Sequence, residues 1–259
     1  MRIRYISANP AGNLTALVLS PVPAGERASL AARLMAACPE GFEQVGYVDE
    51  ASLLTGLPRL DMMGGEFCGN AARAFGLYAA LRRSRDERAL SVCISGARQS
   101  VAITLDPECG EAYADMPLPL CTEQITALGR RVPVVRMEGI AHAVLLNTTP
   151  SEAAADAVLR AMPQDDALGV LFAQGTRMTP LVAVPAAGTR VWESSCGSGS
   201  VALAVLLAER AGHDGTCNFS FDEPGGRIGV CVTMCGGRAV RAVMGGSVTL
   251  GPEKEIELP

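Results

Sequence analysis

The feature that most limits how this chain can fold is a cysteine-glycine pair at the start of a predicted helix, which occurs once in each half. A cysteine followed by a glycine opens a predicted helix at residues 69–83 and another at 197–211. The first motif is Cys68-Gly69-Asn70 and the second is Cys196-Gly197-Ser198, about half the chain length further on. The sequence therefore predicts two related halves, each with a central helix that begins at a cysteine.

Short strand-like runs surround these two helices. Amphipathic patterns also predict helices at 26–37 and 151–162, with Ser151 as the N-cap of the second. Alternating apolar residues and turn signals predict the strands. We expect them at residues 3–6, 15–20, 44–48, 60–63, 90–94 and 100–105 of the first half, and at 132–136, 140–146, 168–172, 177–184, 189–192, 216–221, 227–233 and 238–244 of the second.

Two prolines, Pro117 and Pro119, interrupt the pattern in residues 115–121 and predict a domain crossover there. We expect an N-terminal half-domain at 1–117, to which a C-terminal strand at 246–259 returns. The other half-domain then covers 118–245. A chain of 259 residues suits this division, because single hydrophobic cores stop growing at about 250–300 residues.

The composition narrows the chemistry. Lys254 is the only lysine and lies in a charged tail, whereas a pyridoxal phosphate enzyme needs a buried lysine for its Schiff base. We therefore expect no cofactor. The chain has two histidines and nine cysteines, which makes sulfur the expected source of unusual chemistry. No CxxC occurs, and Cys231 and Cys235 lack a second pair of ligands, so we expect no bound metal.

Partners and compartment follow from the same counts. The first residues have no apolar signal-peptide core, and the longest apolar run, 201–208, is far shorter than the ~20 residues that span a bilayer. We expect a cytoplasmic protein with no membrane partner. A net charge of −5 with one lysine argues against nucleic acid. The expected partner is a small amino-acid substrate, and a homodimer is possible.

The two cysteines suggest a specific reaction. A helix N-terminus presents unpaired N–H groups and partial positive charge, which lower the pKa of a cysteine and bind carboxylates. Two such ends facing one substrate would place its α-carbon between two sulfurs. One thiolate could then remove the α-proton while the other thiol protonates the opposite face. The remaining seven cysteines are expected to be packing residues.

These residues resemble the diaminopimelate epimerase superfamily, which comprises cofactor-independent racemases and epimerases. Besides the cysteine motifs, the resemblance includes residues 9–13 (Asn-Pro-Ala-Gly-Asn) and residues 139–144 around His142. It implies an α+β fold of two pseudo-symmetric domains, each a β-barrel-like set of strands around a central α-helix, with the active site between them. It also implies a PLP-independent isomerase in which Cys68 and Cys196 are catalytic.

Several strings resemble the branch that contains the histidine racemases of staphylopine-type metallophore biosynthesis. They are residues 9–13, 43–46, 65–70, 192–199 and 224–226. The Glu-Arg pair and the asparagine by which diaminopimelate epimerases recognise the distal end of their substrate are missing here. By this resemblance the most expected substrate is histidine, and diaminopimelate is less expected.

The resemblance also implies substrate-binding residues: Asn13, Glu43, Gly69, Asn70, Glu193, Gly197 and Ser198, with Glu66 in support. Glu43 would hold the imidazole, although it could equally be a solvated surface charge. Glu66 and Glu193 would orient the substrate amine or a thiol, or else satisfy a helix dipole. The asparagines could instead stabilise turns. His142 is expected to be structural. A racemase for another amino acid, a non-catalytic amino-acid-binding protein and a thiol redox protein remain alternatives.

Overall fold

The computed structural model describes residues 1–84, 86–106 and 108–258. The chain divides into two compact units, each described here by itself. The first consists of Met1–Ala114 and Gly245–Pro259, and the second of Asp115–Met244. Pro259, the last residue of the predicted returning strand, lies outside the described residues.

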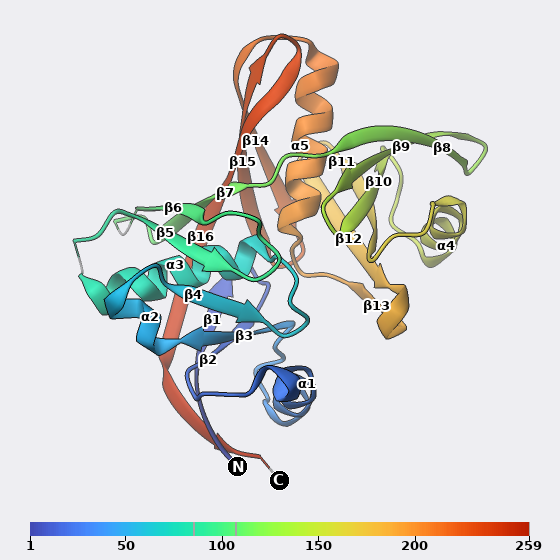
Figure 1. Cartoon of the computed structure of the whole chain (residues 1–259). Coiled ribbons are helices and arrows are strands. Elements are labelled where there is room, and N and C mark those ends of the chain that lie inside the picture. The colour runs from blue at the N-terminus through green and yellow to red at the C-terminus, as the bar shows by residue number, and fades with distance from the viewer. Residues whose placement is uncertain (85, 107, 259) are drawn as a thin grey trace. The chain divides into compact units, whose positions relative to one another are not determined.

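The first unit is a closed barrel. In the described residues, each of its strands is hydrogen-bonded to the next in the order β1-β2-β3-β4-β5-β6-β7-β16, and β16 pairs back with β1 from Arg2↔Glu257 to Pro10↔Val248. The C-terminal part of β16 thus closes the ring (Figure 1). The strands are β1 (Arg2–Pro10), β2 (Thr15–Val18), β3 (Gln44–Asp49), β4 (Arg59–Met62), β5 (Ala89–Ile94), β6 (Val101–Asp106), β7 (Glu111–Met116) and β16 (Arg238–Glu257).

The barrel surrounds helix α3 (Gly69–Arg83), most of which is buried and which contacts β1, β5 and β6. Its small residues explain how the strands approach so closely. A Cβ atom at Gly76 of α3 would lie 2.6 Å from Cγ2 of Ile103 on β6. The helix therefore needs a glycine at this position for β6 to pack so closely against it. The helix ends with Arg82 and Arg83, whose charges suit the negative end of its dipole.

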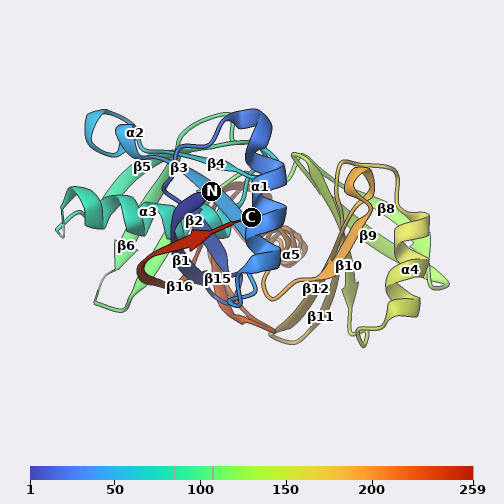
Figure 2. The same cartoon turned by 90° about the horizontal axis from the view of Figure 1, so that it is seen from below.

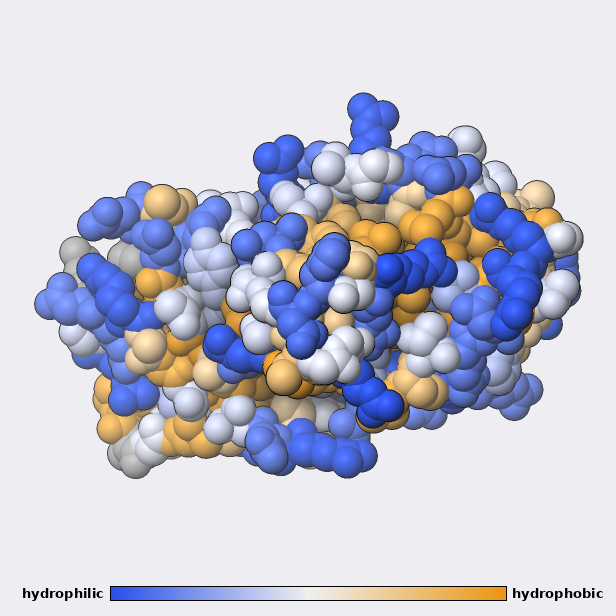
Figure 3. Space-filling view, turned by 90° about the horizontal axis from the view of Figure 1, so that it is seen from above, coloured by the Kyte–Doolittle hydropathy of each residue, from blue (hydrophilic) through white to orange (hydrophobic). Residues whose placement is uncertain are grey.

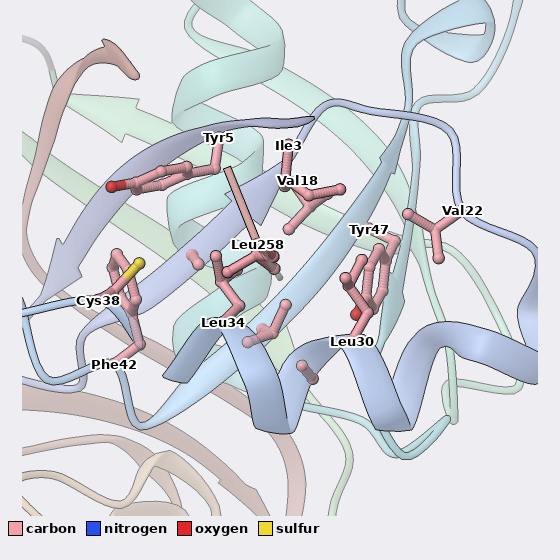
Figure 4. Packing of buried hydrophobic residues seen from close by; sticks show 13 residues of the cluster. Ile3, Tyr5, Val18, Val22, Leu30, Leu34, Cys38, Phe42, Tyr47 and Leu258 are labelled. Atoms are coloured by element: carbon pink, nitrogen blue, oxygen red, sulfur yellow. The ribbon is translucent and has the colours of Figure 1, made fainter. Parts of the chain in front are cut away.

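A second layer of the first unit is formed by α1 (Arg27–Ala37), which follows the short 3-10 helix η1 (Ala24–Glu26). Leu30 and Leu34 on its inner face enter a core cluster with Tyr5, Phe42 and Tyr47 from the strands and their loops (Figure 4). The rings of Tyr5 and Phe42 meet edge to face at 5.7 Å, a favourable aromatic geometry. The helix α2 (Glu50–Thr55) lies between β3 and β4 in the chain.

The second unit has the same kinds of element. In the described residues its strands follow the order β16-β15-β14-β12-β11-β10-β9-β8, with β13 paired to β12. Helix α5 (Gly197–Ala211) contacts β9, β10, β11, β14 and β15, and α4 (Glu152–Ala161) packs on β8 and β11 (Figure 2). The strands are β8 (Cys121–Ala127), β9 (Arg130–Met137), β10 (Ile140–Leu146), β11 (Leu168–Gln174), β12 (Arg177–Val184), β13 (Thr189–Trp192), β14 (Gly215–Glu223) and β15 (Gly226–Cys235), and a 3-10 helix, η2 (Pro185–Ala187), precedes β13.

The two units repeat one topology. In the first, β2 and β3 are parallel with α1 between them, and β4 and β5 are parallel with α3 between them. In the second, β10 and β11 are parallel across α4, and β12 and β14 are parallel across α5. The helices that begin at Cys68 and Cys196 therefore occupy equivalent places in the chain order. This confirms the α+β class and the duplication predicted from the two cysteine motifs.

Several element predictions need correction. The helix α2 and the strands β7 and β8 were missed, and the predicted break at 115–121 is shorter, because β7 continues to Met116 and β8 starts at Cys121. The predicted strand at 238–244 is the first part of the much longer β16. The polar β8 has only Ala127 buried, so its pattern lacks the apolar alternation that reveals a strand.

The described residues contain no helix that is both long and apolar enough to cross a membrane. On the face shown in Figure 3, hydrophobic residues lie among hydrophilic ones. The large hydrophobic side chains that are exposed include Leu54 on α2, Leu120 before β8 and Val240 on β16.

Leu34 provides a test of the first unit's core. Its side chain is fully buried in the core cluster between α1 and the barrel strands. Leu34→Ala should therefore leave a cavity and lower the free energy of unfolding by about 2–5 kcal/mol. Urea denaturation measures this change. The matched control is Leu54→Ala, at a side chain that is 78% exposed, which should change stability by no more than about 0.5 kcal/mol. Equal effects of the two variants would contradict the packing described here.

Candidate active site

In the first unit, the candidate site begins at the N-terminus of α3. Cys68 is the N-cap residue, with an extended backbone, and its side chain is half-buried. Its Sγ accepts a hydrogen bond from the Ala71 N–H at 3.4 Å. The sulfur thus caps a helix end whose first N–H groups have no partner within the helix, and it lies in the partial positive charge of those groups.

Asn70, the second residue of α3, is held by a buried arginine. Arg73 is fully buried, and its Nη2 donates to Asn70 Oδ1 at 2.8 Å. Its Nη1 donates to the carbonyl oxygens of Gly246 at 2.9 Å and Ala112 at 3.4 Å. Since Asn70 Oδ1 accepts from Arg73, the orientation of the amide is set. The sequence prediction of the site did not include Arg73.

Asn13 and Glu43 form a second pair in the same unit. Asn13 Nδ2 donates to Glu43 Oε2 at 2.8 Å, and the Glu43 N–H donates to the Leu14 carbonyl at 2.8 Å. Asn13 is only 3% exposed, and its Oδ1 has no hydrogen-bond partner among the described residues. The pair therefore has acceptor oxygens for an N–H donor, on the Glu43 carboxylate and on the Asn13 amide, and Asn13 Oδ1 is buried.

The register of the barrel places this pair at the same end as Cys68. Asn13 lies two residues before β2 and Glu43 one residue before β3, and these parallel strands begin with Thr15 opposite Gln44. The antiparallel β4 ends near Met62, opposite Gly46, so the turn from β4 to Cys68 leaves the barrel at this end too. The Met63 N–H, which donates to the Val45 carbonyl at 3.0 Å, fixes the start of that turn.

Glu66 is used locally in the turn before Cys68. Its Oε2 accepts from the Gly64 N–H at 2.8 Å, and its carbonyl oxygen accepts from the Ser95 hydroxyl at 3.0 Å. Gly96 lies so close that a Cβ there would be 2.3 Å from the Phe67 nitrogen. Glu66 thus stabilises the turn that leads to Cys68 at the helix start.

In the second unit, a buried carboxylate lies at the start of α5. Glu223, at the end of β14, accepts from the Cys196 N–H at 2.7 Å through Oε2 and from the Ser200 hydroxyl at 2.5 Å through Oε1. All three residues are buried. A negative charge at a helix N-terminus is favourable, and here it also satisfies a backbone donor that would otherwise be buried without a partner.

A chain of polar groups approaches the sulfur of Cys196 from the other side. Ser198 Oγ lies 3.6 Å from Cys196 Sγ and 2.9 Å from Nε2 of His142, a fully buried residue of β10. Burial lowers the pKa of His142 to about 3, which keeps the ring neutral near pH 7.

The predicted lowering of the cysteine pKa is wrong for Cys196. Burial, followed by the nearby carboxylates of Glu193 and Glu223, raises its pKa well above the ordinary value. The Ser198 hydroxyl and the backbone N–H of Gly199 act in the opposite direction but are weaker. Desolvation of the charged form therefore outweighs the helix end at this position. Cys196 is held as a thiol, the form that donates a proton.

The glycine at position 199 keeps room for this sulfur. A Cβ atom there would lie 2.7 Å from Cδ2 of Leu171 and 3.2 Å from Cys196 Sγ. Glu193, which follows β13, is half-buried and donates its backbone N–H to the Pro180 carbonyl at 3.0 Å. Gly69 and Gly197 are the first residues of their helices and are buried.

No metal centre is apparent in the part of the chain that the structure describes, because no three His, Cys, Asp or Glu side chains gather there in a way that could hold an ion. The polar chemistry at the two helix starts thus consists of thiols, hydroxyls, amides, carboxylates and one neutral imidazole. These are proton donors and acceptors, and the arrangement is suited to proton transfer.

Comparison with known proteins decides the family. A family model described as the N-terminal domain of the histidine racemase CntK matches residues 2–254. The chain belongs to this histidine racemase family. It is therefore an isomerase, an amino-acid racemase, as the resemblance of its cysteine motifs predicted.

Two curated relatives align with most of the chain. A histidine racemase of Fusobacterium nucleatum is 30% identical over 218 residues, which cover 78% of this chain and 80% of the relative. A histidine racemase of Staphylococcus aureus is 26% identical over 260 residues, which cover 95% of this chain and 94% of the relative.

Solved structures share the fold at lower identity. A PhzF-family phenazine biosynthesis protein of Enterococcus faecalis has a TM-score of 0.67 at 18% identity, and the match covers both chains fully. A probable proline racemase of Agrobacterium radiobacter has a TM-score of 0.66 at 13% identity, covering 99% of this chain and 93% of that one. The predicted two-part racemase fold is confirmed.

Sequence reasoning missed two buried charged residues at the helix starts. Arg73 interrupts an otherwise small and apolar stretch of α3, and Glu223 is the last residue of a strand just before Pro224. A charge in an apolar run was the available signal for Arg73. Nothing local marked Glu223, because its partners Cys196 and Ser200 are distant in sequence.

The low pKa of His142 predicts how stability depends on pH. The folded-state pKa of about 3 lies below the ordinary 6.5, so the unfolded chain binds one more proton between these values. As the pH falls from about 6.5 towards 3, this group should remove about 1.4 kcal/mol of stability per unit. Urea unfolding at several pH values should show a shallower slope for His142→Gln than for the wild type. Equal slopes would contradict a buried, neutral His142.

Proposed function

We propose that the chain is a cofactor-independent histidine racemase in which Cys68 and Cys196 are the two acid/base groups. In each direction, one sulfur as thiolate removes the proton from the α-carbon of histidine and the other, as thiol, donates a proton to the opposite face. The enantiomer is formed, and the two sulfurs have exchanged protonation states.

The observation that carries this proposal is the position of the two cysteines in the duplicated fold. Each is the N-cap of the long helix of its own unit, and each of these helices lies in the chain between two parallel strands, β4 and β5 for α3 and β12 and β14 for α5. Seven other cysteines share no such equivalence. The protonated state favoured for Cys196 suits a donor, and proton transfer with two such groups needs one thiol and one thiolate.

We infer that the substrate carboxylate is bound by the first turns of the helices. The backbone N–H groups of Gly69 and Asn70 on α3, and of Gly197 and Ser198 on α5, have the direction and partial charge that a carboxylate prefers. The same groups stabilise the additional negative charge that develops on the carboxylate when the α-proton leaves. Asn70, whose side-chain amide is oriented by Arg73, lies in the same first turn of α3.

Histidine as the substrate is supported by the two relatives and by the Asn13–Glu43 pair. An imidazole presents N–H donors at the edge of a flat ring, and Glu43 with the buried Asn13 Oδ1 presents acceptors. Glu193, beside Cys196, and Glu66, in the turn before Cys68, are assigned to substrate orientation and to support of the cysteine turn.

The cellular setting completes the proposal. We propose that the enzyme acts in the cytoplasm on a free amino acid, without a metal ion, cofactor, membrane or nucleic acid. A D-amino acid made in this way would be a building block for a metallophore, in line with the branch that the sequence strings resemble. A homodimer is compatible with this role.

The two-base mechanism predicts the result of removing either sulfur. In deuterium oxide the wild type should convert L- or D-histidine with incorporation of one deuterium at the α-carbon. Cys68→Ala and Cys196→Ala should each lose racemisation by at least about 10²-fold, the lower range for a general acid or base. Circular dichroism and mass spectrometry measure inversion and exchange.

Cys235→Ala is the matched control, because this exposed cysteine lies at the end of β15 and has no assigned role. It should retain wild-type rates. Full racemisation by either single-cysteine variant would refute the two-base mechanism, and exchange without inversion in the wild type would favour a one-base reaction.

The imidazole assignment predicts a substrate-specific defect. Glu43→Gln should lower kcat/KM for histidine by about 10- to 100-fold, as expected for loss of a hydrogen bond to a charged group. Glu255→Gln is the control, since Glu255 forms a solvent-exposed pair with Arg2 and such pairs contribute little. Racemisation assays over a panel of amino acids provide the measurement. Unchanged histidine turnover by Glu43→Gln would contradict the imidazole assignment, and faster turnover of another amino acid by the wild type would contradict histidine as substrate.

A further inference from the structure

The proton transfer proposed for Cys196 depends on which group donates a hydrogen bond to its sulfur. Three residues of the second unit form consecutive contacts: His142 on β10 contacts Ser198 in the first turn of α5, and Ser198 contacts Cys196. The Nε2–Oγ distance is 2.9 Å and the Oγ–Sγ distance is 3.6 Å. Ser198 has a single hydroxyl proton. If His142 donates a hydrogen bond to Ser198 Oγ, the hydroxyl proton is left to donate to the other neighbour, Cys196 Sγ.

The surroundings of His142 select its tautomer. Its Nδ1 is buried and has no hydrogen-bond partner in the described residues. The ring packs against the backbone of Gly169, its neighbour on β11, so closely that a Cβ there would lie 2.0 Å from Nδ1. A buried N–H without an acceptor is rarer than an acceptor without a donor. The proton of the neutral ring therefore belongs on Nε2.

With its proton on Nε2, His142 donates to Ser198 Oγ. The Ser198 hydroxyl must then direct its own proton elsewhere, and Cys196 Sγ is the acceptor within reach. The two charged groups that act on this sulfur, Glu193 and Glu223, are both acidic and disfavour its thiolate. A donor chain from the neutral imidazole opposes them without adding a charge.

We propose that His142 is a positioning residue that fixes the Ser198 hydroxyl as a hydrogen-bond donor to Cys196. Through this chain His142 lowers the cost of forming the Cys196 thiolate, although it neither contacts the substrate nor exchanges a proton during turnover. The inference deepens the proposed racemase mechanism and rests on the catalytic role assigned to Cys196.

The first test observes the tautomer directly. The chain has two histidines, His142 and His213, so the ¹⁵N spectrum of protein labelled with ¹⁵N-histidine contains few signals, and a His213→Asn variant assigns them. We expect His142 to show a protonated Nε2 and an unprotonated Nδ1, with no titration between about pH 5 and 9. A proton on Nδ1, or titration of His142 in this range, would overturn the proposal.

The second test measures the Cys196 thiol without any substrate. The pH dependence of alkylation by iodoacetamide, followed at Cys196 by peptide mass mapping, reports the pKa of that thiol. We expect Ser198→Ala and His142→Leu to lower the rate below the pKa by about tenfold each, which corresponds to about one pKa unit. The exposed Cys235 is an internal control in every sample.

Two further variants separate positioning from packing. His142→Gln keeps an N–H donor on its side chain and should restore most of the alkylation rate that His142→Leu loses. The double variant Ser198→Ala/His142→Leu should match Ser198→Ala alone, because the imidazole acts through the hydroxyl. An unchanged profile in Ser198→Ala, or additive losses in the double variant, would refute the chain. Since alkylation needs no substrate, that outcome is distinct from a failure of histidine racemisation.

Discussion

The burial of a helix start is the constraint on which the rest of this structure depends. A helix enclosed by strands still has backbone N–H groups at its first turn that need acceptors. In the first unit Cys68 Sγ supplies one of these acceptors to Ala71. In the second unit the carboxylate of Glu223 takes the N–H of Cys196 and the hydroxyl of Ser200. The groups that complete the helix ends thus belong to the candidate site or contact it directly.

The hydrogen bonds that Glu223 accepts at the start of α5 also affect the pKa of Cys196. Glu223 stabilises the start of α5, but its charge, together with burial and Glu193, raises the pKa of Cys196. The two cysteines are therefore in different environments, although the topology treats them as equivalent. This difference is compatible with the proposed two-base mechanism, which needs one protonated and one deprotonated sulfur. In the proposal, Ser198 and the neutral His142 reduce the difference, so that the roles of the two sulfurs can be reversed for the other enantiomer.

Much of the fold could be predicted, and the exceptions have physical reasons. The helices at α3, α4 and α5 were predicted because their apolar faces and caps are local, as Ser151 shows by accepting from the Ala154 N–H. Strand β8 was missed because it is mostly exposed and carries no alternating apolar face. The sequence predicts separate strands at 238–244 and 246–259, whereas β16 is continuous from Arg238 to Glu257, and its pairing with β1 at the other end of the chain is not visible in the local pattern.

The sequence by itself determined the duplication, the two cysteines and the racemase family, because repeated local motifs and their spacing survive without any knowledge of contacts. Only the tertiary structure decided what surrounds each cysteine. Three residues that surround the helix starts, Glu223, Arg73 and His142, are buried. Each forms a hydrogen bond with a residue that is far away in the sequence, so the local sequence pattern does not reveal the contact. The pKa of a thiol depends on desolvation and nearby charge, and both arise only when the chain has folded.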